Sequence, residues 1–495
     1  MRAPDTHTRD RLPNLMRRLG PASATALAAE LGVSVATLHR LLQERAGEVL
    51  QAGLARRSRH ALRRRLRDGT GTLPLVAIDA QGRAHDAGQL VLVQPAGCWL
   101  PLHQLAGTHW PLPAPAANAP AAIAPRDAML DAARDGWWPG LHYPLQDLRP
   151  QGYLGRQLAR TGHAAWGVSP DPQRWSDDDV LHVLAQAGID GPGNLVIGEP
   201  AFARWQAQAL APAEPLAAAA LGPAYAALAD QAVAAGVAGS SAAGEFPKFP
   251  ALRDRAGAST PHVLVKFSGA GGSAAERRWA DLLVCEHLAL QVLASLPGLP
   301  DLPGAGAARS AIVQHAGRTF LEVERFDRHG LWGRSPLVSL ATLDGAFLGQ
   351  GSGDWPRLAA ALGAMGMLEA AAQPAIGLLW WFGRLIANTD MHTGNLSFHG
   401  TRVGAGGTVA AGPLALAPAY DMLPMAYAPL PGGEVPPRAF DPALPQPAQR
   451  AVWLAACAAA IGFWTLAAAD SRISADFRTT AAGNAQMLAG LADRV

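Results

Sequence analysis

Two residues in the second half of the chain constrain the fold most strongly. The run HVLVKFS (262–268) has the β-branched alternation of a short strand and carries Lys266. Glu286 follows twenty residues later, on a clearly amphipathic helix over 274–294. The pattern predicts a strand lysine that meets a helix glutamate.

Lysine usage singles out the same region. Of 41 basic residues only two are lysine, Lys248 and Lys266, and they lie 18 residues apart beside a glycine-rich run. The alternative is chance. We favour a chemical reason, because a compact ammonium fits where a planar guanidinium does not.

A second group of polar residues follows a long apolar helix over 375–387. In NTDMHTGN (388–395), Asp390 and Asn395 have the D-x-x-x-x-N spacing of a kinase catalytic loop, and Asp421 in PAYDM follows at the distance expected of a second magnesium-binding aspartate. With the Lys–Glu pair, this order predicts phosphoryl transfer from ATP.

Each of these residues also has a structural explanation when taken alone. A strand lysine can snorkel, a helix glutamate can be solvated, and Asp390 or Asp421 can stabilise a turn. The small residues from Gly239 to Gly244 are by themselves only a turn, and Glu245 stands where a Walker A motif needs lysine, which excludes a P-loop NTPase. The combined order, with a strand ending in ERFDR (324–328) as a hinge, favours the kinase.

The first 70 residues differ in charge from the rest. They carry 14 arginines and six acidic residues, a net charge of +8, whereas the remaining residues carry −6. The segment 24–43 reads as helix, Gly32 turn and a second helix capped by Ser34, and a hairpin around Gly53 follows. This pattern predicts a winged helix-turn-helix that binds DNA; the alternative is a three-helix domain with a solvated arginine face.

The DNA-contacting residues expected from this pattern lie at two places. They are the exposed start of the second helix (Ser34, Val35, Ala36, Thr37, His39 and Arg40) and the tip of the hairpin (Arg56, Arg57 and Arg59).

The motifs NTDMHTGN, PAYDM, ERFDR and the loop SSAAGEFPK resemble those of the HipA-type serine/threonine kinases, the toxins of bacterial toxin–antitoxin systems. The resemblance covers about 233–490. The amino-terminal segment and PLQDLRPQGYLGR (144–156) resemble the branch of this family that carries its own DNA-binding domain, whereas ordinary members bind DNA through a separate antitoxin.

The resemblance implies ATP and Mg²⁺ as cofactors and assigns roles to residues. Asp390 is the catalytic base, Asn395 and Asp421 bind the metal, and Ser241 or the adjacent Ser240 is autophosphorylated. The implied nucleotide site consists of Ala243, Gly244, Glu245, Phe246, Pro247, Lys248, Lys266, Glu286, Glu324, Arg325, Phe326, His392, Thr393, Gly394, Asn395, Tyr420 and Asp421. Of these, Phe246 stands where the family more often has a polar residue.

Composition excludes several other classes of protein. Three separated cysteines form neither a disulfide framework nor a cysteine zinc site, and His392 and His399 lack a third ligand. The start of the chain has no apolar signal core, so we expect a cytoplasmic protein. The apolar run 451–469 is long enough to span a bilayer, but its alanine content favours a buried or half-buried helix.

We therefore expect an α+β protein, with a winged helix-turn-helix joined to a two-lobed, kinase-like fold whose carboxy-terminal lobe is mostly helical. The expected domains are 1–70 (DNA binding), 71–232 (a HipA-like subdomain with a Pro/Ala-rich loop at 111–125), 233–334 (amino-terminal lobe) and 335–495 (helical lobe).

The predicted function is that of an ATP- and Mg²⁺-dependent protein serine/threonine kinase. The alternative is a transcriptional regulator whose kinase-like half senses nucleotide. Expected partners are double-stranded DNA and a protein substrate, for which the family suggests a translation factor such as an aminoacyl-tRNA synthetase; whether a separate antitoxin exists stays open.

The scarcity of lysine leads to a testable prediction. Lys266→Arg keeps the charge but places a larger, planar group between Glu286 and the phosphates, so phosphoryl transfer should fall in a chain that remains folded. Steady-state kinetics beside circular dichroism measure this. Wild-type kinetics for Lys266→Arg would reduce the scarcity of lysine to coincidence.

Overall fold

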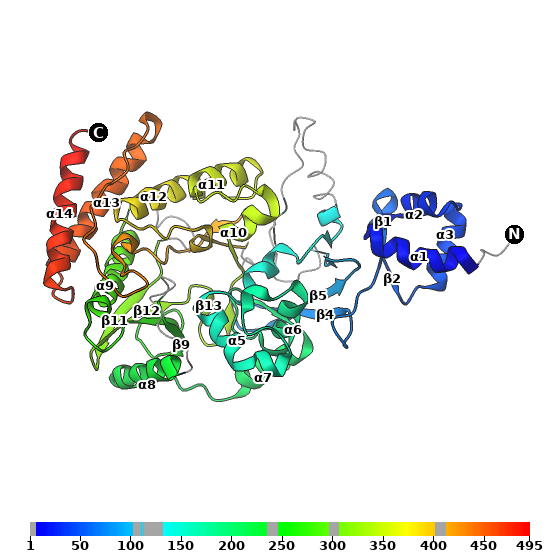
Figure 1. The fold of residues 1–495 in the computed structure, drawn as a ribbon, viewed down its shortest axis with the longest axis horizontal. Coiled ribbons are helices and arrows are strands. Elements are labelled where there is room, and N and C mark those ends of the chain that lie inside the picture. Colours follow the sequence, from blue (N-terminus) through cyan, green and yellow to red (C-terminus); the bar gives the residue numbers. More distant parts are fainter. Residues whose placement is uncertain are drawn as a thin grey trace.

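The computed structural model describes residues 6–101, 110, 112, 132–234, 246–296, 306–400 and 412–495. Figure 1 shows an elongated molecule, with the amino-terminal helices at one end of its long axis and the carboxy-terminal helices at the other. All pairings between the named strands are antiparallel. The chain is therefore an α+β protein, as predicted.

The amino-terminal part packs three helices on a small sheet of order β1-β3-β2. Its elements are α1 (Thr6–Leu19), β1 (Ala22–Ser23), α2 (Ala24–Leu31), α3 (Val35–Glu44), β2 (Val49–Ala52) and β3 (Arg59–Leu62). Gly32 ends α2 with a φ of 69°, and the Ser34 side chain accepts a hydrogen bond from the Thr37 amide at the start of α3. The predicted turn, helix cap and hairpin are thus present.

Salt bridges fasten this part to the next one. Helix α6 (Asp177–Ala187) begins with three aspartates; Arg64 bonds to Asp178, and Arg67 lies 2.7 Å from Asp179. At the hairpin, Arg57 lies 3.2 Å from Asp135. Some arginines of the basic segment therefore hold the amino-terminal part to the middle part.

The middle part is built around a five-stranded sheet of order β7-β6-β5-β4-β8. Its strands are β4 (Thr72–Ile78), β5 (Ala84–Leu92), β6 (Cys98–Trp99), β7 (Trp137–Trp138) and β8 (Leu195–Ile197). Its helices, besides α6, are α5 (Gly152–Trp166) and α7 (Glu199–Leu210). Ser176 and Asp179 form a capping box at the start of α6.

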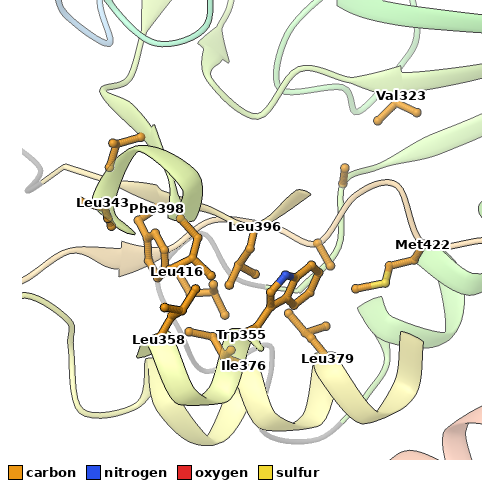
Figure 2. Close-up of a cluster of buried hydrophobic side chains, with 14 of the residues drawn as sticks. Val323, Leu343, Trp355, Leu358, Ile376, Leu379, Leu396, Phe398, Leu416 and Met422 are labelled. Carbon is orange, nitrogen blue, oxygen red and sulfur yellow. The ribbon is translucent and has the colours of Figure 1, made fainter. Parts of the chain in front are cut away.

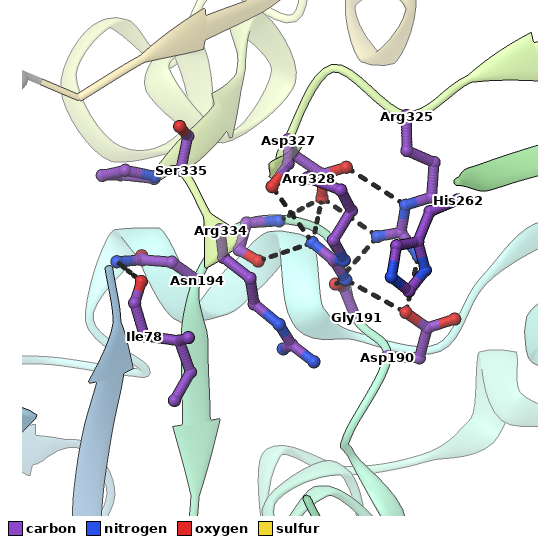
Figure 3. Close-up of polar contacts among 12 residues, drawn as sticks. Ile78, Asp190, Gly191, Asn194, His262, Arg325, Asp327, Arg328, Arg334 and Ser335 are labelled. Carbon is purple, nitrogen blue, oxygen red and sulfur yellow. Dashed lines mark hydrogen bonds and ion pairs between the residues drawn. The ribbon is translucent and has the colours of Figure 1, made fainter. Parts of the chain in front are cut away.

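Two sets of polar contacts fix the middle part to the rest of the chain. Asp147 accepts hydrogen bonds from the Ser339 amide and hydroxyl, each at 2.6 Å, and from the Thr342 hydroxyl at 2.8 Å. At the second contact, shown in Figure 3, the Asp190 carboxylate pairs with Arg325 at 2.6 Å and with Arg328 at 3.0 Å.

Asp327 completes the second contact. Its carboxylate lies 2.7 Å from Arg328 and 3.0 Å from Arg325 (Figure 3). It also accepts a hydrogen bond from the Gly193 amide. Burial opposes the charge of both aspartates, but the two arginines outweigh it and lower the pKa of Asp190 to about 2 and that of Asp327 further. The ERFDR run therefore fastens the middle part to the following sheet.

The next sheet, of order β11-β12-β10-β9, has a helix on each face. Its elements are α8 (Leu221–Ala234), β9 (Lys248–Leu252), β10 (His262–Phe267), α9 (Ala274–Ala294), β11 (Ser310–His315) and β12 (Arg318–Glu324). Tyr225 of α8 packs with Val265 and Phe320 on one face, and Leu321 packs with α9 on the other. Helix α9 spans the predicted residues.

The carboxy-terminal part is mostly helical and closes with a hairpin of two long helices (Figure 1). Its helices are α10 (Leu340–Leu343), α11 (Trp355–Ala364), α12 (Ala372–Leu385), α13 (Arg450–Ala469) and α14 (Ala475–Ala492). The short strands β15 (Leu337–Ser339), β16 (Ser397–His399) and β17 (Ala415–Leu416) form a sheet, and β13 (Arg328–His329) pairs with β14 (Gly333–Arg334).

Among the described residues, one helix, α13 with the turn before it, is long and apolar enough to cross a membrane. In the structure it packs against α9, α12 and α14 and buries Trp453, Phe463 and Trp464. The Trp464 indole also donates a hydrogen bond to the Leu385 carbonyl at 3.0 Å. This agrees with the interpretation of a half-buried helix.

An apolar cluster in this part fixes two polar loops, the segment 388–395 and the segment around Asp421. Figure 2 shows Leu396 and Met422 in one group with Trp355 and Leu379. Leu396 and Met422 are only 2% and 1% exposed, and they directly follow Asn395 and Asp421. The core therefore determines where these two polar residues lie.

A buried histidine makes a prediction about stability. His142 is fully buried between Trp138 and Tyr143, and neither of its ring nitrogens has a hydrogen-bond partner in the described part of the chain. Burial lowers its pKa from 6.5 to about 3. As the pH falls, His142 is therefore protonated in the unfolded chain before it is protonated in the folded one. The neutral His142 contributes to the free energy of unfolding above pH 6.5, and this contribution is lost between pH 6.5 and 3.

Urea unfolding at several pH values tests this. Between pH 7.5 and 5 the wild type should lose about 2 kcal/mol more stability than His142→Leu, since one pKa unit is worth about 1.4 kcal/mol. If the stability of the two proteins changes with pH in parallel, His142 has the same pKa in the folded and the unfolded chain, which contradicts the prediction.

Candidate active site

The two lysines lie directly opposite each other on neighbouring strands. In the antiparallel pair β9–β10, Lys248 is the register partner of Lys266. Two like charges at such a position destabilise a sheet unless carboxylates compensate. Lys266 is 4% exposed, and its ammonium lies 2.8 Å from both oxygens of Glu286 and also contacts Asp421.

Helix α9 places Glu286 at this position. The helix starts with a capping box between Ser273 and Glu276, and its middle turns pack against the sheet so that Glu286 is completely buried. A buried carboxylate requires a charged partner, and Lys266 supplies it. The expected contact between Lys266 and Glu286 is present.

Lys266, Glu286 and Asp421 shift one another's pKa values. Burial raises the pKa of Glu286, and Lys266 only partly opposes this. Burial also disfavours charge on Lys266 and Asp421, but the mutual attraction outweighs it, so the pKa of Lys266 is raised and that of Asp421 is lowered. Lys248 and His392 further lower the pKa of Asp421. Asp421 is thus held as a carboxylate.

The segment 388–395 forms a compact loop after α12. The Asn395 side chain donates a hydrogen bond from Nδ2 to the Asp390 carbonyl at 2.9 Å, while Asp390 itself is exposed. The exposed His392 accepts the Gly394 amide on Nδ1 at 3.1 Å, which caps a short 3₁₀ turn over Thr393–Asn395.

Two side chains connect this loop to the segment around Asp421. The Tyr420 hydroxyl donates to the Gly394 carbonyl at 2.7 Å. The Asn388 side chain donates to the Asp421 carbonyl at 3.2 Å and accepts the Asp390 amide at 3.0 Å. Sequence reasoning assigned no role to Asn388, although it is the first residue of the NTDMHTGN motif.

Of the residues assigned to the nucleotide site, Glu324, Arg325 and Phe326 do not all lie here. Phe326 packs on Tyr420, with ring centroids 5.5 Å apart. Glu324 is opposite Val263, on the sheet face that α8 covers, and its carboxylate binds Arg253 at 2.9 Å. The Arg325 side chain is engaged with Asp190 and Asp327. Of this run, the structure brings only the side chain of Phe326 to Tyr420.

Only the end of the glycine-rich loop can be described. Ala243, Gly244 and Glu245, and the candidate phosphorylation sites Ser240 and Ser241, lie outside the described residues. Phe246 is buried and packs on Trp279 of α9, with ring centroids 4.6 Å apart. The Pro247 carbonyl accepts the Phe267 amide. Phe246 therefore anchors the end of the loop to α9, which explains an apolar residue there.

The candidate DNA-contacting residues are partly engaged within the protein. At the start of α3, Ser34, Val35, Ala36 and His39 are exposed, whereas Thr37 and Arg40 are half-buried and lie 3.4 Å apart through their side chains. At the hairpin, Arg56 is exposed, Arg57 pairs with Asp135, and Arg59 donates to the Pro21 carbonyl.

Comparison with known proteins gives a consistent assignment. The family model of the HipA-like C-terminal domain matches residues 240–475, and that of the YjjJ-like toxin, middle domain, matches residues 70–206. The toxin YjjJ of Escherichia coli strain K12 is 36% identical to this chain over 468 residues, which is 93% of each protein.

Two solved structures are remotely similar. HipA of Shewanella oneidensis, solved with HipB and operator DNA, has a TM-score of 0.45 at 14% identity, over 85% of this chain and 97% of that one. The proinflammatory kinase CtkA of Helicobacter pylori has a TM-score of 0.25 at 14% identity, over 36% and 53%. On the sequence match over nearly its whole length, the chain belongs to the family of HipA-type toxins that includes the toxin YjjJ.

Proposed function

We propose that the chain is an ATP- and Mg²⁺-dependent protein serine/threonine kinase with a DNA-binding amino-terminal domain. The observation that carries the proposal is the buried ammonium of Lys266 between Glu286 and Asp421, beside the loop that holds Asp390 and Asn395. A positioned lysine ammonium is the group that kinases use to bind the nucleotide phosphates. Membership of the family of HipA-type toxins also supports the proposal.

The donor atoms at this position fit Mg²⁺. Asp421 is a carboxylate at neutral pH because its pKa is lowered. Asn395 uses its amide nitrogen on the Asp390 carbonyl, which leaves Oδ1 as the atom for a ligand. Carboxylate and amide oxygens are the ligands that Mg²⁺ prefers. Asn395 and Asp421 would hold the metal, which would neutralise charge on the phosphates when bound.

The roles of the protein residues follow from their positions. Lys266, held by Glu286, would bind the nucleotide phosphates, and the strand partner Lys248 adds positive charge on the same side. The exposed Asp390 would accept the proton of a serine or threonine hydroxyl. Little covalent work is left for the protein, so catalysis is mainly orientation and charge neutralisation.

The amino-terminal part supports DNA binding. Its helices α2 and α3 and the hairpin β2–β3 have the order of a winged helix-turn-helix, and the exposed start of α3 and Arg56 would face the duplex. Because Arg57, Arg64 and Arg67 already pair with aspartates of the middle part, we assign the phosphate contacts mainly to the other arginines.

The kinase proposal predicts that Asp390→Asn lowers phosphoryl transfer at least about 100-fold, the usual contribution of a general base. Asp421→Asn should do the same and also weaken nucleotide binding. Transfer of labelled phosphate from ATP to lysate proteins measures this, with the exposed Asp493→Asn as the matched control.

A wild-type rate for Asp390→Asn would contradict the assignment of the base. Nucleotide binding without any transfer by the wild type would instead favour a nucleotide-sensing regulator.

The DNA proposal predicts a salt-dependent affinity for duplex DNA that a chain starting at residue 71 lacks. Arg56→Ala should reduce the slope of log affinity against log salt by about 0.9, the value for one lost phosphate contact. The exposed Arg174→Ala, in the middle part, serves as the matched control. Polarisation titrations at several salt concentrations measure both. If the full and the shortened chain bind duplex DNA with equal affinity, the basic segment does not bind DNA and its arginines serve only to hold it to the middle part.

A further inference from the structure

Asn388 is a buried side chain that joins the two polar loops. It is 6% exposed, and its two polar atoms bond to the main chain on either side, Nδ2 to the Asp421 carbonyl at 3.2 Å and Oδ1 to the Asp390 amide at 3.0 Å. One side chain thus contacts the main chain of both the candidate base and the candidate metal ligand.

The chemistry of the two contacts allows only one orientation of this amide. A carbonyl needs a donor and a main-chain N–H needs an acceptor, so exchanging Nδ2 and Oδ1 would break both bonds. Aspartate can keep only the contact with Asp390, and alanine can keep neither. This difference separates the two contacts by mutation.

The backbone around Asn388 is in a costly conformation. Asp421 has a φ of 54° and Ala387 a φ of 60°, both in the left-handed region that favours glycine. Such residues cost about 1–3 kcal/mol each and persist only where their surroundings determine them. The Ala387 carbonyl accepts the Ala426 amide at 3.0 Å, and the Asn388 side chain binds Asp421.

The end of α12 does not need the Asn388 side chain. The helix is closed by the main chain, since the Asn388 amide donates to the Gly383 carbonyl at 2.9 Å. The side chain is therefore available for the contacts between the loops.

We propose that Asn388 is a positioning residue for phosphoryl transfer, which holds the carboxylate of Asp421 in its metal-binding position and couples it to the loop of Asp390. The inference rests on the proposed kinase function. It assigns Asn388 no contact with the nucleotide, so its effect acts through Asp421 and Asp390.

The test measures the Mg²⁺ concentration needed for binding a fluorescent, non-hydrolysable ATP analogue, beside thermal stability and kcat and KM. Asn388→Asp loses the donor to Asp421 and should raise the Mg²⁺ requirement about 3- to 10-fold, the value of one neutral hydrogen bond. Asn388→Ala should raise it similarly and lower kcat further, because the contact with Asp390 is also lost. KM for the protein substrate should stay unchanged in Asn388→Asp.

The matched control is Asn484→Asp. Asn484 is also buried and donates from Nδ2 to an oxygen, the Tyr427 hydroxyl at 2.8 Å, but it lies on α14. This variant should lose stability while its Mg²⁺ requirement stays that of the wild type.

The outcomes separate the inference from the function on which it rests. If wild-type protein binds the analogue without any dependence on Mg²⁺, the proposed function fails. If the wild type depends on Mg²⁺ and Asn388→Asp has the same requirement, the function stands and Asn388 is only a structural residue.

Discussion

The arrangement of the candidate site depends on the burial of one ammonium group. Lys266 cannot remain charged inside the protein without partners, and Glu286 on α9 and Asp421 in the carboxy-terminal part provide them. Removing one partner of such a buried pair typically costs about 3–5 kcal/mol, so the cluster ties the sheet, α9 and the 420–421 segment into one arrangement. The buried apolar neighbours Leu396 and Met422 hold the loops against the core.

Contacts that are local in sequence could be predicted well. The strand over 262–268, the helix over 274–294 and the cap at Ser34 each follow from residues within one or two turns. The ERFDR run shows where this reasoning ends. Its arginines bond to Asp190, which lies 135 residues before Arg325 and 138 before Arg328, and no local pattern indicates a partner at that separation. Asn388 was missed for a similar reason, because its contact with Asp421 spans 33 residues.

The charge of the amino-terminal segment has two uses that its composition alone cannot separate. Three consecutive aspartates at the start of α6 pair with arginines, of which Arg64 and Arg67 come from this segment. Helix α6 ends shortly before Asp190, which bonds to Arg325 and Arg328. The middle part therefore contacts the basic segment at one end of α6 and the strand next to the candidate active site at the other.

The most direct test of the central claim is a crystal structure with ATP and Mg²⁺ bound. Our account predicts that Lys266 keeps Glu286 but exchanges Asp421 for a phosphate oxygen, while Asp421 and the Oδ1 atom of Asn395 bind the metal. A nucleotide bound elsewhere, for example in the cavity of about 350 Å³ lined by Arg253, Arg255 and Arg309, with the Lys266–Asp421 contact intact, would contradict it.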